Sequence, residues 1–298
     1  MKSIYVLSLL LLAAIWGSSF LFMRVAVVEF GPFALNLIRV GLAALILLPI
    51  CLRKDFRQDF KTHWKSFMLL GASNYAIPFT LLSYTSLTIN SGTTSLINAT
   101  TPIFTAILGV LFFTQKITRV QLIGLFFGFF GIYIISQKTL LLDFNQGLLA
   151  IIAGLIASCG YGLTILYSKK YLQAVSAINL TAGGLFFGAL YLVFPGIVYW
   201  PTQMPSLNSW LAALLLATLC TVIALIIFFQ IIKKIGVLTS SSVTFLIPIF
   251  AILWGTLFLN EKITFNLIVG VVVIIVGTSL IIFKPFKSFK QTTSKKNR

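Results

Sequence analysis

The sequence predicts an all-α integral membrane protein whose ten transmembrane helices are arranged as two inverted five-helix repeats. Three observations predict this fold class: an unusually apolar composition, ten apolar runs of spanning length, and an internal repeat. The chain has 298 residues, of which 59% are hydrophobic and 9% are charged, and its mean hydropathy is +1.04. Soluble domains carry about 25% charged residues. This chain therefore has too few charged side chains to cover a water-soluble domain, and it is too hydrophobic to be disordered.

Each apolar run is long enough for a spanning helix, which needs about 20 residues. Transmembrane strands would instead alternate in polarity over about ten residues, and the runs do not. The first run exceeds the apolar core of a signal peptide, which has about 7–15 residues, so we expect it to remain as a helix. The ten runs are, in chain order, 4–23, 33–52, 66–86, 92–113, 120–136, 146–167, 177–199, 208–230, 237–258 and 264–283.

The cationic residues predict the orientation of these helices. If the N-terminus lies inside, 18 of the 22 Lys and Arg residues fall in inside segments and three fall in outside segments. Cytoplasmic loops carry such an excess, so we expect both termini in the cytoplasm and the protein in the cell membrane. The formal net charge of +17 then faces anionic lipid headgroups. No nucleic-acid partner is expected, because no recognised binding module accompanies the charge.

The chain repeats itself at an offset of 146 residues. Pro102-Ile103-Phe104 recurs as Pro248-Ile249-Phe250, and Lys116-Ile117-Thr118 recurs as Lys262-Ile263-Thr264. A general bias towards Leu and Ile does not explain matched Pro and Lys residues. Because each repeat holds five spans, an odd number, the second repeat enters the membrane from the opposite side. Lys116 is therefore expected inside and Lys262 outside.

The repeat defines the expected organisation of the chain and its class of function. We expect one five-helix unit over residues 1–137, a second over 138–283, and a basic cytoplasmic tail over 284–298. Inverted repeats are characteristic of secondary transporters, whose solute site lies near the middle of the bilayer between the repeats. A channel or a structural membrane protein stays open as an alternative. An integral-membrane enzyme is less favoured, because the chain has a single His and no recognised catalytic motif.

Several motifs resemble one known group of transporters. They are Trp16-Gly17-Ser18-Ser19-Phe20, Arg39, the segments around Pro102 and Pro248, Gln115-Lys116-Ile117-Thr118 and Glu261-Lys262-Ile263-Thr264. In these residues the sequence resembles the drug/metabolite transporter superfamily, specifically the EamA-type ten-helix exporters, over roughly residues 4–283. The resemblance implies solute export or exchange across a cytoplasmic membrane by alternating access. The family usually has Glu at the end of both fourth helices, and in this sequence Gln115 replaces the first of them.

Arg39 is the one charged residue well inside a predicted span. A charge there is costly, so it usually faces a cavity or has a partner. One interpretation is a clamp for a substrate carboxylate. The other is a structural role, in which Arg39 bonds loop carbonyls, extends outward to water or pairs with Glu29.

Two polar stripes mark the fourth and ninth spans. Thr94, Asn98 and Thr101 share one helix face, and Ser241 and Thr244 repeat the pattern before Pro248. These side chains either bond between helices or form a polar wall around the solute. Pro102 and Pro248 each lack a backbone donor, so we expect helix bends at both, and a third bend at Pro78.

Aromatic and polar residues at mid-depth complete the expected solute site. They are Trp16 and Ser19 in the first span, Asn74 and Tyr75 in the third, and Tyr161 in the sixth. Aromatic side chains grip organic solutes, although in membranes they more often anchor or pack helices.

Acidic residues are absent from the middle of every span. Ion-driven carriers often use such a group for coupling, so we expect a facilitator or exchanger without carboxylate-based proton coupling. With one buried charge, the expected solute is a small neutral or zwitterionic metabolite such as an amino acid. The three scattered Cys and single His suggest no metal site, and no cofactor is expected.

Overall fold

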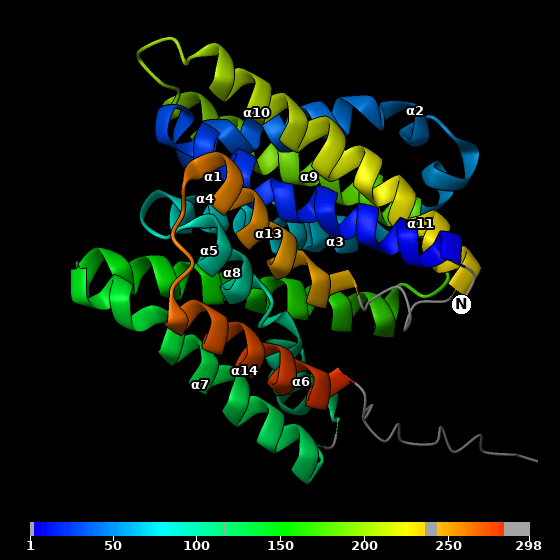
Figure 1. The fold of residues 1–298 in the computed structure, drawn as a ribbon. Coiled ribbons are helices and arrows are strands. Elements are labelled where there is room, and N and C mark those ends of the chain that lie inside the picture. Colours follow the sequence, from blue (N-terminus) through cyan, green and yellow to red (C-terminus); the bar gives the residue numbers. More distant parts are fainter. Residues whose placement is uncertain (1–2, 116, 143, 236–242, 283–298) are drawn as a thin grey trace, which may run out of the picture.

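The computed structural model describes residues 3–115, 117–142, 144–235 and 243–282. Within these ranges the regular elements are all helical (Figure 1). In chain order they are α1 (Ser3–Ile46), α2 (Leu48–Cys51), α3 (Lys54–Leu70), η1 (Gly71–Ala76), α4 (Ile77–Thr88), α5 (Ser91–Asn98), α6 (Thr101–Phe113), α7 (Arg119–Leu142), α8 (Phe144–Tyr171), α9 (Ala177–Val198), α10 (Leu207–Ala217), η2 (Thr218–Ile223), α11 (Ala224–Ile235), α13 (Val243–Leu259) and α14 (Phe265–Ile282).

Five of the described helical stretches are long and apolar enough to cross a membrane, and three shorter apolar helices accompany them. The longest, α1, contains the first predicted span and most of the second, whose end falls in α2. The two spans meet at Gly31, whose φ of 70° and ψ of 167° are not helical. A loop was predicted between these spans, over residues 24–32, but the chain stays helical up to Phe30. The break comes where Gly31 accepts a positive φ and Pro32 lacks a backbone donor.

The third and eighth predicted spans each contain a π-helical segment. The third is built from α3, η1 and α4, and the eighth from α10, η2 and α11. The two π segments, Gly71–Ala76 and Thr218–Ile223, are related by an offset of 147 residues. A π turn accommodates one extra residue in the helix. No pattern in the sequence predicted these segments.

The fourth predicted span is interrupted. Its first part, α5, ends at Asn98, and α6 begins at Thr101 with Pro102 in its first turn. The equivalent proline, Pro248, lies inside α13, which is continuous from Val243 to Leu259. The helix is therefore interrupted just before Pro102 in the first repeat and continuous through Pro248 in the second.

Close contacts between helices follow the repeat. Gly17 of α1 approaches α13, where an added Cβ would lie 2.7 Å from Phe250 Cβ. Its repeat equivalent, Gly162 of α8, approaches α6, where a Cβ would lie 2.9 Å from Thr105 N. Such small residues let helices pack tightly in membranes. Each half thus contributes one such glycine, in equivalent places.

The last helices of the two repeats pack against each other. In Figure 1, α7 and α14 lie side by side at one edge of the bundle. Gly277 of α14 approaches the backbone of α7, so that an added Cβ would lie 2.7 Å from Gly128 N and 2.8 Å from Gly124 O. The contact therefore joins the same helix of each repeat.

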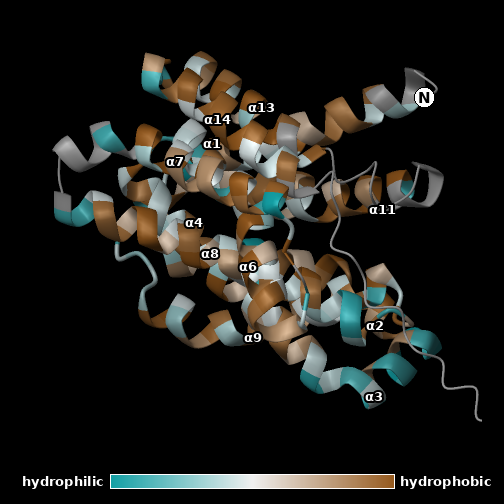
Figure 2. Cartoon of the chain, turned by 90° about the horizontal axis from the view of Figure 1, so that it is seen from below, coloured by the Kyte–Doolittle hydropathy of each residue, from teal (hydrophilic) through white to brown (hydrophobic). Residues whose placement is uncertain are grey.

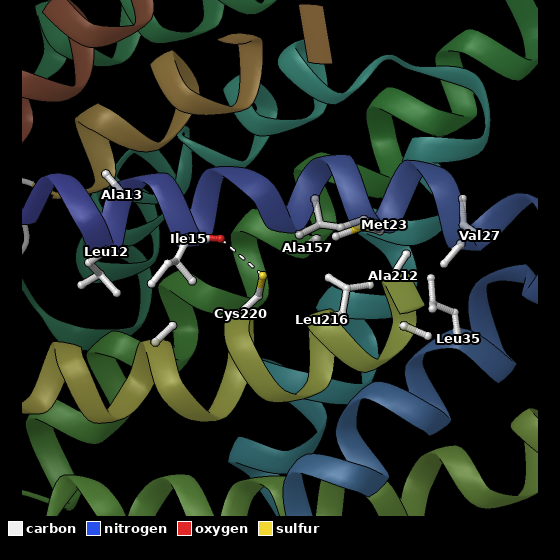
Figure 3. Packing of buried hydrophobic residues seen from close by; sticks show 14 of the residues in the cluster. Leu12, Ala13, Ile15, Met23, Val27, Leu35, Ala157, Ala212, Leu216 and Cys220 are labelled. Atoms are coloured by element: carbon white, nitrogen blue, oxygen red, sulfur yellow. Dashed lines mark hydrogen bonds between the residues drawn. The ribbon is translucent and has the colours of Figure 1, made fainter. Parts of the chain in front are cut away.

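The largest buried cluster of the described residues joins α1 to α4, α8, α10, η2, α11 and α13. Figure 3 shows Ile15 and Met23 of α1 facing Leu216 of α10 and Cys220 of η2. The thiol of Cys220 donates to Ile15 O at 3.3 Å. In Figure 2 most of the length of the helices is hydrophobic, as expected for helices in a lipid bilayer. The cluster joins helices of both repeats.

Candidate functional site

Arg39 is buried inside the bundle, with 5% of its surface exposed. Its Nε donates a hydrogen bond to Thr221 Oγ1 at 3.2 Å, and its guanidinium carbon lies 3.7 Å from the ring centroid of Phe79. Extension of the side chain to water is therefore wrong. Pairing with Glu29 is also wrong, because no salt bridge joins these two residues in the described part of the chain. The Glu29 carboxylate instead accepts hydrogen bonds from the backbone and hydroxyl of Ser206.

Four elements bring the Arg39 cluster together. Arg39 comes from the second part of α1, Phe79 from α4, Tyr161 from α8 and Thr221 from η2. The rings of Phe79 and Tyr161 are 6.5 Å apart, and Tyr161 and Cys220 are within electrostatic range of the guanidinium. In the described part of the chain no salt bridge involves Arg39. The cluster thus holds a buried cation surrounded by aromatic and hydroxyl groups.

The break between α5 and α6 lies against α8, one turn away from Tyr161. Ser158 Oγ of α8 donates to Ile97 O at 3.0 Å, and Thr101 Oγ1 donates to Asn98 O at 2.8 Å. Hydroxyl groups therefore satisfy carbonyls near the interruption, as a low-dielectric surrounding requires. The Oδ1 of Asn98 is buried and has no hydrogen-bond partner.

Two predicted hydroxyls bond within their own helices. Thr94 is fully buried, and its Oγ1 donates to Asn90 O at 2.9 Å. Ser19 Oγ donates to Trp16 O at 2.5 Å. Trp16 is half-buried, with its ring 5.1 Å from that of Phe228. Neither hydroxyl is part of the Arg39 cluster.

The residues predicted in the third span lie next to the cluster. Tyr75 is buried against α9, where Gly184 leaves room for its ring. Its ring centroid is 5.8 Å from that of Phe79. Asn74 is half-buried, and the buried Pro78 lies in the first turn of α4, directly after η1. Tyr75 thus supports the ring that covers Arg39.

The predicted stripe of the ninth span is described only in part. Ser241 lies outside the described residues, whereas Thr244 is exposed and Pro248 is buried in α13.

Phe79, Thr221 and Cys220 contribute to the Arg39 cluster but were not predicted from the sequence. One signal was present for Thr221, because an offset of 147 residues matches it with Asn74, which was predicted. The offset of 146 pairs it with Tyr75, which was also predicted. Either register of the repeat therefore pointed to Thr221.

Comparison with known proteins identifies the family. Residues 3–137 and residues 148–283 each match the EamA-like transporter family. The chain belongs to this family. The resemblance to EamA-type transporters expected from the sequence motifs is thus confirmed.

Relatives of this EamA-like protein span nearly its whole length. It is 25% identical over 275 residues to the uncharacterized transporter YoaV of Bacillus subtilis, covering 91% of this chain and 94% of the relative. It is 28% identical over 262 residues to an uncharacterized transporter in the trpA 3'region of Buchnera aphidicola, covering 85% and 86%. A solved crystal structure of a protein with 14% identity matches the fold with a TM-score of 0.62, covering 94% and 96% of the two chains.

Family and structure together establish the class of this protein. It is a multi-pass membrane protein of a transporter family. Its all-helical structure is consistent with ten membrane helices in two repeated halves, as predicted. Membership of this family implies a small-molecule solute and a lipid bilayer as partners.

Proposed function

We propose that this EamA-like protein moves a small zwitterionic metabolite with a carboxylate group, such as an amino acid, across the cell membrane. It works as an exporter or exchanger by alternating access. One observation carries the proposal: Arg39 is a buried cation with no acidic partner among the described residues.

The electrostatics of Arg39 favour a carboxylate as the missing partner. An unpaired charge within a membrane bundle is costly, and a solute carboxylate would supply the opposite charge. Thr221 engages Nε and so restrains the plane of the guanidinium. Arginine recognises carboxylates through two parallel hydrogen bonds from its planar group. Thr221 thus has the role of a positioning residue.

The remaining residues suit the organic part of such a solute. Phe79 and Tyr161 provide aromatic surface beside the guanidinium, as is common in sites for organic ligands. Asn98 offers a buried, unpartnered amide oxygen that can accept a hydrogen bond from a solute ammonium group. The site carries one cation, so a zwitterion fits it better than a highly charged anion.

The position of the cluster supports alternating access. Arg39 and Phe79 belong to the first repeat, and Tyr161 and Thr221 belong to the second. Rocking of one repeat against the other would therefore change access to the group between them. Gly17 and Gly162 provide equivalent close contacts in the two halves, about which such motion can occur.

A counterflow screen tests the proposal. The purified chain is placed in liposomes and assayed with amino acids, their amides and their esters. We expect saturable counterflow of a free amino acid and none of its amide. R39Q should lower transport by at least roughly 100-fold, because hydrogen bonds to charged groups contribute about 1.5–3 kcal/mol each. R39K should raise KM, because lysine keeps the charge without the planar fork.

R24Q serves as the matched control, because Arg24 is a second arginine of α1 that donates to Ser86 O outside the cluster. A folded R39Q variant with wild-type counterflow of every solute contradicts the proposal. Unchanged transport by N98L would contradict the role proposed for Asn98. Single-channel currents in place of saturable counterflow would identify a channel.

A further inference from the structure

The elbow between the second and third predicted spans forms a distinct surface at one end of the bundle. It consists of the short apolar helix α2 and the first part of α3, up to a kink at His63, whose φ is −123° and ψ is 18°. Figure 2 shows hydrophilic residues along this part of α3. Phe56 and Phe60 lie on the side of α3 that packs into the bundle. The segment thus has the amphipathic character of a helix at a membrane surface.

An apolar hollow of about 330 Å³ opens at this elbow. Leu48 and Cys51 of α2, Phe56 and Phe60 of α3, and Phe186 of α9 form its apolar wall. Leu48 and Phe186 are exposed, and both lie within predicted membrane spans. We therefore expect the hollow to be accessible from the bilayer.

A basic hollow of about 230 Å³ adjoins the apolar one. Lys54, Arg57, Gln58 and Lys61 line it, and Arg57 and Lys61 also line the apolar hollow. The two cations thus stand at the boundary between an apolar and a polar space.

The two acidic residues of α3 bond to groups other than these cations. Asp55 Oδ1 lies 3.0 Å from Arg53 Nε in the one salt bridge among the described residues. Asn179 Nδ2 of α9 donates to Asp59 at 2.7 Å and to Asp55 at 3.4 Å. Loss of water raises the pKa of Asp55, but Asn179 and Arg53 outweigh this effect and hold the pKa below its usual value. None of the three cations that line the basic hollow forms a salt bridge within the described residues, and neither aspartate lines it.

We propose that this elbow binds an anionic phospholipid. The phosphate lies in the basic hollow near Arg57 and Lys61, and an acyl chain lies in the apolar hollow along Phe186. A free phosphate would leave the apolar hollow unused, and a neutral lipid would leave the cations unpaired. The distribution of Lys and Arg predicts that this end of the protein faces the cytoplasm, where anionic headgroups attract basic segments.

Lipid binding to the detergent-purified full chain tests this site. Native mass spectrometry compares phosphatidylglycerol with phosphatidylcholine carrying the same acyl chains. We expect the wild type to retain more phosphatidylglycerol, and R57Q/K61Q to lose this preference by roughly fivefold for each cation removed. The control K169Q/K170Q removes two exposed lysines at the end of α8 and should keep the preference.

The outcomes separate this site from simpler explanations. Equal losses in R57Q/K61Q and K169Q/K170Q overturn the proposal, because the binding would then reflect total charge. Displacement of the lipid by glycerol 3-phosphate at equal concentration also overturns it, because no acyl chain would be needed. Thermal unfolding verifies that both double variants are folded. Because the measurement is lipid retention, its result is independent of the solute proposed for Arg39.

Discussion

At the scale of single residues, Glu261 bonds to the N-terminus of α5, which lies 170 residues earlier in the chain. Its carboxylate accepts from Ser91 N at 2.8 Å, Ser91 Oγ at 2.7 Å and Gly92 N at 3.4 Å. A carboxylate at a helix N-terminus satisfies free backbone donors and interacts favourably with the helix dipole. Glu261 therefore ties the loop after α13 to the start of α5.

The repeat-equivalent residue, Gln115, has the same local backbone. Gln115 N donates to Gly109 O at 2.9 Å, and Glu261 N donates to Gly255 O at 3.1 Å. The preceding residues, Thr114 and Asn260, both have a φ of 53°. The departure from the family pattern at position 115 thus changes the charge at this turn and leaves its geometry intact.

We expect E261A to destabilise the protein by about 0.5–2 kcal/mol, the usual effect of losing a cap. E261Q should cost less, because an amide oxygen still accepts a hydrogen bond. Thermal unfolding in detergent measures both variants, with K262A as the control, because Lys262 is the exposed neighbour. Equal unfolding temperatures for E261A and K262A would contradict the capping role.

The hydroxyl of Thr221 makes a second testable contact. It accepts from Arg39 Nε at 3.2 Å and donates to Leu216 O at 2.8 Å. T221V keeps the shape and removes both bonds, so we expect a loss of about 1–3 kcal/mol from unsatisfied buried groups. T221S should restore most of the stability and transport. If T221V equals the wild type in unfolding temperature and in KM, Thr221 does not position Arg39.

At the scale of elements, the two π segments change which residues face the cluster. Each lies midway along its span, and the two are matched by the repeat. An extra residue in a turn rotates the following helix relative to the preceding one. Thr221 within η2 reaches Arg39, and Tyr75 within η1 packs beside Phe79. The π segments thus build the site, which is a common place for such turns.

The contact between α7 and α14 gives a prediction for helix packing. G277A would place a Cβ 2.7 Å from the backbone of Gly128, so the helices must separate, at a cost of about 1–3 kcal/mol. G41A is the matched control in α1, where the nearest atom would be 4.0 Å from the added Cβ. There we expect no loss, or a gain of about 0.5–1 kcal/mol from better helix propensity.

Thermal unfolding of G277A and G41A compares the same chemical change at a tight and an open position. A similar unfolding temperature for the two would mean that α7 and α14 separate at little cost.

At the scale of the whole molecule, the inverted repeat predicts opposite sides for equivalent loops. Position 116 lies outside the described residues, and Lys262 lies in the loop between α13 and α14. In a variant whose three native Cys are replaced by Ala, we expect K116C to react with a membrane-impermeant thiol reagent only in inverted vesicles. K262C should react only in intact cells. Labelling of both from one side would contradict the inverted arrangement and alternating access with it.

The sequence by itself determined the class of the molecule. Hydropathy, charge and the internal repeat can all be read along the chain without knowing which residues meet in space. They predicted a helical membrane protein and its family, but not the helical loop before Gly31 or the break between α5 and α6. They also selected Arg39, because a charge in an apolar run is visible without knowledge of its neighbours. The sequence did not reveal that Ser19 and Thr94 bond their own helices, because a hydroxyl has the same pattern whichever partner it finds.

Only the tertiary structure decided what surrounds Arg39. Thr221 lies 182 residues away along the chain, and its contact depends on a π segment and on how the two repeats pack. The partner of Glu261 is similarly remote. Such contacts arise because the lipid phase leaves buried polar groups no water, so each finds a partner set by packing rather than by neighbouring sequence.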